Sequence, residues 1–290
     1  MDNRILFVHI PKTAGTSFRL AAEKYFTKEN TLYDYSPSSV ETSEVILEYF
    51  YKQKDLYKLK QETQKKDKCF LSGHFHIAKY MYLFETLNII TFVRNPVDQV
   101  LSHYEHHCRH LGYTKDLRDF IQEDRFKNVQ SRLLSAKPLE LIGFIGLTER
   151  YNESIEMIND YYGFNLEILK KNINPNKKVF DIDESIVEQI KKENSQDVEL
   201  YEKAKALFED RWHKYLSKEV YIHTYIQEEN DDLIKGVAFT KNMQSPLKIK
   251  IPFQNTEVEV IVKDYRPGML AHNFPRDGFV GFEYKKGIEK

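Results

Sequence analysis

Residues 5–19 read ILFVHIPKTAGTSFR, and this stretch indicates the fold class. Ile5–His9 is a short apolar run of the kind that forms a fully buried strand of a parallel sheet. Pro11 ends such a strand, because proline has no N–H group to donate. The apolar residues between Phe18 and Tyr25 recur at helical spacing, so we expect a helix directly after the loop.

The loop between this strand and this helix has the composition of an anion site. A strand, a loop of small residues and a helix, in that order, direct unpaired backbone N–H groups at an anion. A lysine adds a mobile positive charge, and three hydroxyl side chains add donors. The alternative is an ordinary strand, turn and helix without a ligand. We predict a phosphate-binding loop made of Lys12, Thr13, Ala14, Gly15, Thr16 and Ser17.

Spacing distinguishes this loop from other phosphate-binding loops. The kinase and NTPase loop, G-x-x-x-x-G-K-[ST], has its lysine directly after the second glycine. Here Lys12 precedes the small residues and Gly15 is the only glycine of the loop, so the three spaced glycines of a dinucleotide fingerprint are absent as well. The order Pro-Lys-Thr-Ala-Gly-Thr-Ser resembles the 5′-phosphosulfate loop of the sulfotransferases that use 3′-phosphoadenosine 5′-phosphosulfate (PAPS).

A second strand–turn–helix unit begins at residue 87. Residues 87–93, LNIITFV, are an uncharged run expected to form a buried strand, and the Asn-Pro pair that follows is typical of a helix start. The guanidinium of Arg94 at the strand end can donate two hydrogen bonds to a phosphate, and Ser102 in the helix can face the same site. The segment FVRNPVDQVLSHY resembles the family segment that binds the 3′-phosphate of the donor, which implies that role for Arg94 and Ser102. The alternative is that Arg94 caps the helix through an ion pair with Asp98.

Two histidines at another strand exit are candidate bases. Residues 69–71 are a strand candidate, and SGHFH follows at residues 72–76. A neutral imidazole with a pKa near 6.5 suits removal of a proton from a sugar hydroxyl. The segment resembles the His-Gly-His of the heparan sulfate and uronyl 2-O-sulfotransferases, with Ser72 at the first histidine and His74 at the second. The resemblance implies that His74 is the catalytic base, and it leaves open whether His76 shares the role.

Four more histidines and two further segments are weighed as candidate sites. His103, His106, His107 and His110 fall at helical spacings, but no H-E-x-x-H is present, so we expect a solvated, partly aromatic helix face and no metal. The segments NVQSRLL at 128–134 and GLTER at 146–150 also resemble parts of the family. Arg132 is a candidate for contact with a donor or acceptor anion, and ordinary salt bridging is the equal alternative.

The composition excludes several classes of function. Of 290 residues, 41% are hydrophobic and 30% are charged, and the formal net charge of −1 gives no global field that attracts nucleic acid or an anionic membrane. No apolar run approaches the roughly 18 residues of a membrane span, and no signal or anchor segment is evident. Cys69 and Cys108 are too few for a disulfide framework and fit a reducing compartment, so we expect a cytoplasmic enzyme.

The remaining chain predicts more helices and a change of architecture near residue 230. Helical spacing recurs in residues 41–60, 117–121, 128–134, 154–162, 186–192 and 197–215, residues 142–147 form a third buried run, and residues 172–175 read as a loop. From about Asn230 the apolar residues alternate with polar ones, as in residues 247–253 and 258–262. We therefore predict a main domain at residues 1–229 and a small antiparallel β appendage at residues 230–290.

The resemblance, which runs from about Ile5 to Phe208, implies a fold and a reaction. The fold is α/β, with a P-loop-like parallel sheet flanked by helices and the donor at the carboxyl ends of the strands. The reaction moves a sulfuryl group from PAPS to an acceptor hydroxyl, on a glycan or another small molecule, and releases 3′,5′-ADP. His74 acts as base, Lys12 steadies the leaving group and no metal is required.

Two alternatives from other classes stay open. A kinase-like nucleotide enzyme would need a Gly-Lys-Thr loop and a magnesium-binding aspartate at a strand end, and neither is evident. A non-catalytic anion-binding or interaction module would use the β appendage as its docking surface. The sequence does not identify the acceptor and leaves the oligomeric state open.

Overall fold

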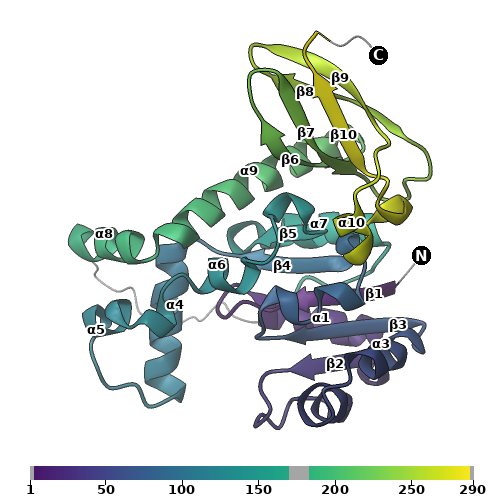
Figure 1. Cartoon of the computed structure of the whole chain (residues 1–290). Helices are drawn as coiled ribbons and strands as arrows, with labels where there is room; N and C mark the ends of the chain where they lie inside the picture. The colour runs from purple at the N-terminus through teal and green to yellow at the C-terminus, as the bar shows by residue number, and fades with distance from the viewer. Residues whose placement is uncertain (1–2, 170–182, 288–290) are drawn as a thin grey trace.

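The structure, a computed structural model, describes residues 3–169 and 183–287, so the loop expected at residues 172–175 lies outside the described residues. Within the described chain, five parallel strands form one sheet in the order β2-β3-β1-β4-β5 (Figure 1). Their bounds are β1 Asn3–Val8, β2 Thr31–Asp34, β3 Lys68–Gly73, β4 Ile89–Val93 and β5 Phe144–Leu147. The predicted α/β class with a parallel sheet flanked by helices is confirmed.

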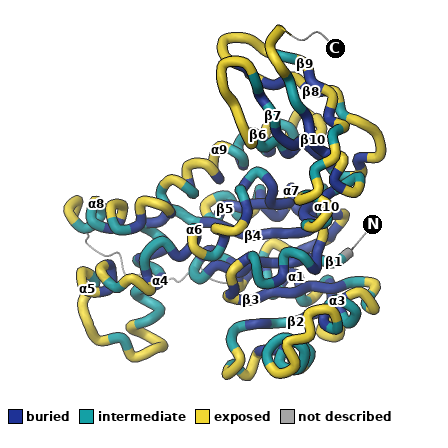
Figure 2. Tube along the Cα trace, viewed as in Figure 1, coloured by how far each residue is buried: buried dark blue, intermediate teal, exposed yellow. Residues whose placement is uncertain are grey.

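Strand β1 lies at the centre of this sheet because residues 5–8 are all apolar and are buried on both faces. Ile5, Leu6, Phe7 and Val8 are each at most 1% exposed, and the strand pairs with β3 on one side and β4 on the other. Val8 is opposite Gly73 of β3 and Thr91 of β4 in the parallel register. Figure 2 shows β1, β3 and β4 as the continuous buried layer of the molecule. The loops after these strands therefore leave the sheet side by side.

Helices surround the sheet, mostly where their apolar spacing predicts them. The α-helices are α1 Gly15–Phe26, α2 Glu44–Ile46, α3 Leu56–Gln64, α4 Pro96–His110, α5 Leu117–Gln122, α6 Val129–Leu134, α7 Tyr151–Tyr162, α8 Glu184–Glu193, α9 Ser195–Ser217 and α10 Pro267–Ala271. Short 3-10 helices span Lys28–Asn30, Ile77–Lys79, Met81–Leu83, Thr86–Asn88, Asp124–Phe126, Leu139–Leu141, Thr148–Arg150 and Pro275–Gly278. Asn95 caps α4 as expected, because its side chain accepts from the N–H of Val97 at 3.0 Å.

One predicted helix is interrupted. The helical spacing of residues 41–60 continues through α2 into a π-helical segment, Leu47–Lys52, and then stops. Lys54 has a left-handed φ of 56°, and the Asp55 carboxylate accepts from the N–H of Lys58 at 2.8 Å to start α3. The break follows from a new helix cap, which the spacing of apolar residues does not reveal.

The C-terminal part is antiparallel, as predicted, but its first strand precedes residue 230. Its strands are β6 His223–Glu229, β7 Leu233–Phe239, β8 Leu247–Phe253, β9 Thr256–Val262 and β10 Gly281–Lys285. They form a sheet of order β10-β7-β6 and a hairpin of β8 with β9. Strand β6 shows no clear alternation in sequence, because it is an edge strand whose pairing shifts between Ile226 and Glu228 and of which only His223 is buried. The alternation of apolar and polar residues therefore does not predict strand β6.

This appendage is fixed to the amino-terminal edge of the parallel sheet. Leu87 and Leu141 of the α/β part belong to the apolar core of the appendage. Asn273 donates from its side chain to the carbonyl oxygens of Tyr82 (2.9 Å) and Phe84 (3.2 Å), and its own carbonyl accepts from the N–H of Thr86 at 3.3 Å. Among the helices of the described chain, none combines the length and the apolar character needed to cross a bilayer.

Candidate active site

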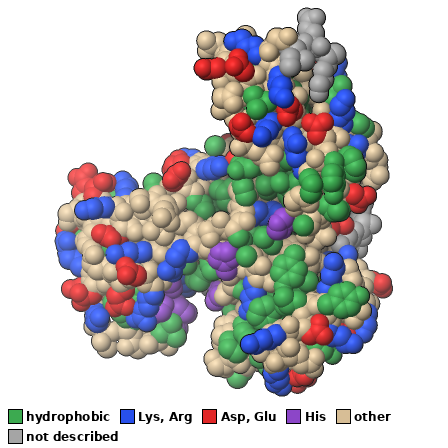
Figure 3. All heavy atoms as spheres, in the orientation of Figure 1, with side chains coloured by type: hydrophobic (Ala, Val, Ile, Leu, Met, Phe, Trp, Pro, Cys, Tyr) green, Lys and Arg blue, Asp and Glu red, His purple; other side chains and the backbone are tan. Residues whose placement is uncertain are grey.

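Four loops and one helix meet in a cleft of about 430 Å³ at the carboxyl-terminal edge of the parallel sheet. The loops follow β1, β3, β4 and β5, and helix α4 forms the facing wall. Figure 3 shows a hollow between the side of the molecule that carries α4 and α5 and the side that carries β2, with histidine side chains beside it. The cleft contains most of the predicted site residues, namely Lys12, Ala14, Gly15, Thr16, His74, Arg94 and Ser102. Residues up to 90 positions apart in sequence, Lys12 and Ser102, are thus brought together by the strand register.

The loop after β1 has the geometry of an anion cradle. Among the described residues, no hydrogen bond uses the N–H groups of Ala14, Gly15 or Thr16, which lie at the start of helix α1. Lys12 and Ala14 adopt left-handed φ values of 68° and 62°, which bend the backbone around the cleft. Unpaired N–H groups at a helix start, next to a lysine, are favourable surroundings for a phosphate.

Two side chains from the neighbouring strand–helix unit hold this loop in place. Arg94, directly after β4, donates from Nη1 to the carbonyl oxygen of Lys12 at 3.1 Å. Gln99 of α4 donates from Nε2 to the carbonyl oxygen of Pro11 at 3.0 Å. Burial, followed by the nearby Arg94 guanidinium, lowers the pKa of Lys12 from its ordinary value. An anion placed between the two cations would relieve their repulsion.

The backbone of Arg94 is itself held by a buried glutamine. Gln130 of α6 accepts from the N–H of Arg94 through Oε1 and donates to its carbonyl through Nε2, both at 2.9 Å. Its side chain is fully buried. The segment NVQSRLL therefore contributes to the site by positioning Arg94, whereas Arg132 of the same segment donates to the carbonyls of Asp124 and Arg125.

His74 is oriented as a base should be. Its Nδ1 lies 2.6 Å from the carbonyl oxygen of His9, and a carbonyl can only accept, so Nδ1 carries the hydrogen and Nε2 has the free lone pair in the neutral ring. Desolvation of the ring by the surrounding protein lowers the pKa of His74. Part of the side chain is nevertheless exposed to solvent in the cleft. The ring is therefore neutral at physiological pH and able to accept a proton at Nε2.

His9, which the sequence reasoning assigned only to the strand, lies behind His74 and completes the wall of the cleft. The two rings are 4.5 Å apart, and His9 Nδ1 lies 3.0 Å from the hydroxyl of Tyr35. Arg19 can only donate, and it does so to the Tyr35 oxygen at 3.1 Å, so the Tyr35 hydrogen is directed at His9 Nδ1. Burial holds the pKa of His9 well below its ordinary value. Its position at the carboxyl end of β1 was the available signal.

Three histidines of α4 line the cleft, which corrects the expectation of a solvated helix face. His103 is 9% exposed and contacts Phe120 and Phe126, and burial lowers its pKa to about 3. His106 faces the cleft with a pKa lowered to about 4 by burial, and His107 lies 3.2 Å from His103 between their Nε2 atoms. His110 is exposed and does not line the cleft. Within the described residues, no three His, Cys, Asp or Glu side chains converge as a metal site would require.

Three predicted residues do not reach the cleft. The Thr13 hydroxyl is buried and donates to the carbonyl of Ile10 at 2.9 Å, so it stiffens the loop from within. Ser17 is buried in the first turn of α1. His76 is exposed outside the cleft, where its Nε2 lies 2.9 Å from the Ser135 hydroxyl and its Nδ1 accepts from the N–H of Ala78. The structure thus separates His76 from His74, because the chain leaves the strand direction after Gly73 and His76 caps the 3-10 helix Ile77–Lys79.

Comparisons with known proteins add the following. The sequence matches no protein-family model and no curated protein. Among solved structures, the chain is similar to a sulfotransferase from Alicyclobacillus acidocaldarius, with 13% sequence identity and a TM-score of 0.41, over 72% of this chain and 98% of that chain. At this identity and this TM-score the likeness does not identify a substrate or a mechanism for this chain. A function must therefore be inferred from the residues that line the cleft.

Proposed function

We propose that the protein is a sulfotransferase that moves a sulfuryl group from PAPS to an acceptor hydroxyl. The observation that carries the proposal is the pairing of two anion-binding elements in one cleft. The loop at residues 12–16 offers free N–H groups and Lys12, and the end of β4 offers Arg94, with Ser102 on the next helix. Two such elements fit a nucleotide that carries phosphate groups at two positions, as PAPS does.

The chain supplies the groups that in-line sulfuryl transfer needs. The sulfur bonds to the acceptor oxygen while its bond to the 5′-phosphate oxygen breaks, and the acceptor proton passes to His74 Nε2. The bonding electrons leave with the phosphate oxygen of 3′,5′-ADP. Lys12 and the N–H groups of residues 14–16 are the donors near which this negative charge would develop, and such donors stabilise oxyanions by several kcal/mol.

The positioning of His74 supports its role as general base. The carbonyl of His9 fixes the tautomer, and the chain Glu41–Arg19–Tyr35–His9 holds the neighbouring ring through contacts of 3.0, 3.1 and 3.0 Å. General bases contribute about 10²–10⁴-fold to rate. In this scheme a hydroxyl of a glycan or another small molecule enters beside His74. The scheme assigns no step to a metal ion.

The test is release of 3′,5′-ADP from PAPS in the presence of hydroxyl acceptors, measured for the wild type and for His74→Asn. Asparagine keeps a donor for the carbonyl of His9 but has no basic nitrogen, so we expect transfer to fall by about 10²-fold or more with the fold intact. The matched control is His76→Asn, which lies outside the cleft and should stay within about twofold of the wild type.

Two outcomes would contradict this assignment. A His74→Asn variant with the wild-type rate would remove His74 from the mechanism. Binding of PAPS without turnover on any hydroxyl acceptor would favour a non-catalytic anion-binding module. The kinase-like alternative predicts instead that nucleotide binding needs Mg²⁺ and ignores the 3′-phosphate.

A further inference from the structure

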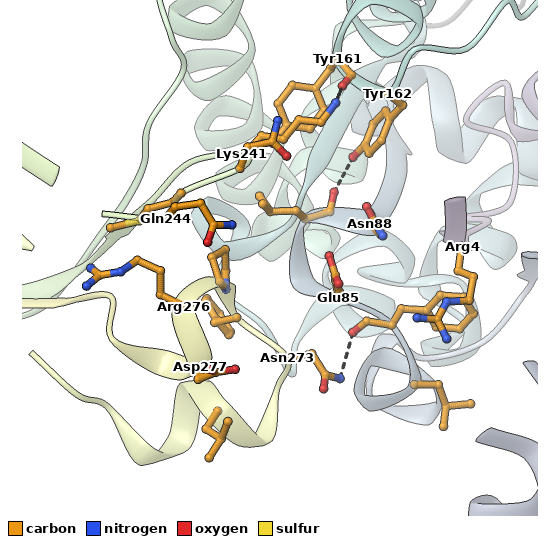
Figure 4. A pocket seen from close by; sticks show the side chains of 18 of the residues that line it. Arg4, Glu85, Asn88, Tyr161, Tyr162, Lys241, Gln244, Asn273, Arg276 and Asp277 are labelled. Atoms are coloured by element: carbon orange, nitrogen blue, oxygen red, sulfur yellow. Dashed lines mark hydrogen bonds between the residues drawn. The ribbon is translucent and has the colours of Figure 1, made fainter. Parts of the chain in front are cut away.

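A second cavity, of about 500 Å³, opens where the β appendage meets the α/β part. Figure 4 shows side chains of both parts around it: Arg4, Glu85, Asn88, Tyr161 and Tyr162 come from the α/β part, and Lys241, Gln244 and Asn273 come from the appendage. Arg4 is at the amino end of β1, whereas His9 follows its carboxyl end. Five residues of strand separate the two cavities by about 16 Å, so this cavity is distinct from the transfer cleft.

The lining of this cavity is rich in amide side chains. They come from α3, from the 3-10 helix before β4, from the turn between β7 and β8, and from the segment after α10, namely Gln64, Asn88, Asn242, Gln244 and Asn273. A carboxamide both donates and accepts, which matches a hydroxyl group that does the same. The half-buried ring of Tyr161 adds an apolar surface to the same wall.

Several of these groups are available to a ligand. The side chains of Lys60, Gln64, Asn242 and Gln244 form no hydrogen bond or ion pair with any other residue that the structure describes. Lys60 and Gln64 are one helical turn apart on α3 and therefore share a face. Lys241, by contrast, already donates to the carbonyl of Tyr161. The cavity thus has a fixed part and a part whose polar groups have no partner within the described chain.

The charges around the cavity are of both signs. Lys60, Lys241 and Arg4 line the cavity together with Glu85 and Asp277. Arg276 also lines the cavity but donates from Nη1 to the carbonyls of Val262 (3.2 Å) and Phe279 (3.0 Å). A mixed lining does not select a highly charged ligand, and it suits groups that both donate and accept.

The backbone of the appendage is bent to form this wall. Among the described residues that line the cavity, Asn242, Asn273, Arg276 and Asp277 have left-handed φ values of 60°, 52°, 50° and 52°. Asparagine and aspartate tolerate this conformation, but at Arg276 it costs about 1–2 kcal/mol. Strain of this kind is common at binding sites, where the surrounding contacts enforce it.

We propose that this cavity binds a saccharide. Its size lies within the usual range for ligand pockets, its position between two parts of the chain is a common one for such pockets, and its amide-rich lining pairs with hydroxyl groups. The binding itself does not depend on sulfuryl transfer. The biological role that we infer, which is to hold a glycan acceptor away from the transfer cleft, rests on the proposed function.

The experiment is titration calorimetry of the full chain with linear hexasaccharides of glucose, of N-acetylglucosamine and of galacturonic acid, and with a hexaglutamate peptide. We expect at least one saccharide to bind, and the double variant Lys60→Met/Gln64→Leu to weaken its affinity about tenfold or more. Gln64 is exposed and Lys60 is half-buried, and neither side chain bonds to another described residue, so the fold should persist. Lys58→Met, half-buried on the same helix but outside the cavity, is the matched control and should bind normally.

The outcomes separate this proposal from the proposed function. His74→Asn should bind the saccharide with unchanged affinity, because His74 is at the other edge of the sheet. Absence of binding to all three saccharides, or equal affinity in Lys60→Met/Gln64→Leu and the wild type, would overturn the saccharide site. So would binding of hexaglutamate alone, which would indicate an acidic-peptide site. A chain that fails these tests can still bind 3′,5′-ADP and transfer sulfuryl groups.

Discussion

The hydrogen bond from His74 Nδ1 to the carbonyl of His9 decides which nitrogen of the ring, Nε2, can accept a proton in the proposed mechanism. A sequence shows that a histidine follows a strand, but the tautomer depends on a partner 65 positions away. The same contact ties His74 to the loop proposed to bind phosphate, since His9 lies three residues before Lys12.

The first prediction concerns the pH dependence of transfer. Burial lowers the pKa of His74 below 6.5, so the neutral base is the main species at neutral pH. We expect kcat/KM to be constant from about pH 7 upward toward pH 8, and to fall about tenfold per unit only below the lowered pKa. A rate that rises steeply between pH 7 and 8 would mean that the essential base has a raised pKa and is another group.

The second prediction concerns Arg94. Lysine keeps the positive charge but lacks the planar guanidinium, which can donate two N–H groups to a phosphate, and it loses the contact to the carbonyl of Lys12. We expect Arg94→Lys to reduce the preference for 3′,5′-ADP over 5′-ADP by about tenfold, measured by calorimetry. Arg132→Lys is the control, because that guanidinium binds carbonyls outside the cleft. An unchanged preference in Arg94→Lys would place the 3′-phosphate elsewhere.

At the scale of the elements, the unit β1–loop–α1 depends on a close approach between Gly15 and His9. A Cβ at Gly15 would lie 2.0 Å from His9 Cδ2, which is far inside van der Waals contact. The glycine is therefore required by packing, because the imidazole fills the space where a side chain would be.

The third prediction follows from this contact. Gly15→Ala must displace either the His9 ring or the start of α1, so we expect it to lower stability by about 1–3 kcal/mol and to abolish 3′,5′-ADP binding. Gly163→Ala is the control, since Gly163 has a φ of 70° with open space around it and its substitution should cost about 1–2 kcal/mol without an effect on binding. Equal binding by both variants would contradict the proposed cradle.

The elements show how far a single sequence predicts a site. The strand, loop and helix at residues 5–26 and the unit that contains Arg94 are predictable because each depends on local apolar spacing and on local turn chemistry. The cleft-facing histidines of α4 are not predictable, because spacing gives the faces of a helix but not which face turns toward the sheet. The positioning role of Gln130 likewise depends on a contact between α6 and the end of β4.

At the scale of the whole molecule, the charges nearly balance, and two cavities are lined by polar and charged side chains. The net charge of −1 does not reveal that the cleft at the carboxyl-terminal edge of the sheet is lined by the cations Lys12 and Arg94, or that the second cavity has charges of both signs. The second cavity could not be predicted, because its lining comes from segments as distant as Arg4 and Arg276. Only the packing of the appendage on the sheet brings them together.

The fourth prediction is acid destabilisation of the whole chain. Burial lowers the pKa of His103 and of His223 to about 3, so between pH 6.5 and 3 the unfolded chain binds protons that the native chain does not. Each such histidine reduces the free energy of unfolding by up to about 1.4 kcal/mol per pH unit as the pH falls through this window. Urea midpoints at pH 7.5, 6.0 and 5.0 should fall in that order. Constant midpoints would show that these rings titrate normally in the folded chain.

The most direct test of the central claim, that the cleft binds a 3′-phosphorylated sulfuryl donor, is the thermal unfolding midpoint with 3′,5′-ADP compared with 5′-ADP at the same excess. A ligand at about a hundred times its Kd stabilises the folded state by about 2.7 kcal/mol, which raises Tm by several degrees in a chain of this size. We predict a rise with 3′,5′-ADP that is absent or much smaller with 5′-ADP and does not need Mg²⁺. Equal shifts, a shift that requires Mg²⁺, or no shift with either nucleotide would contradict the claim.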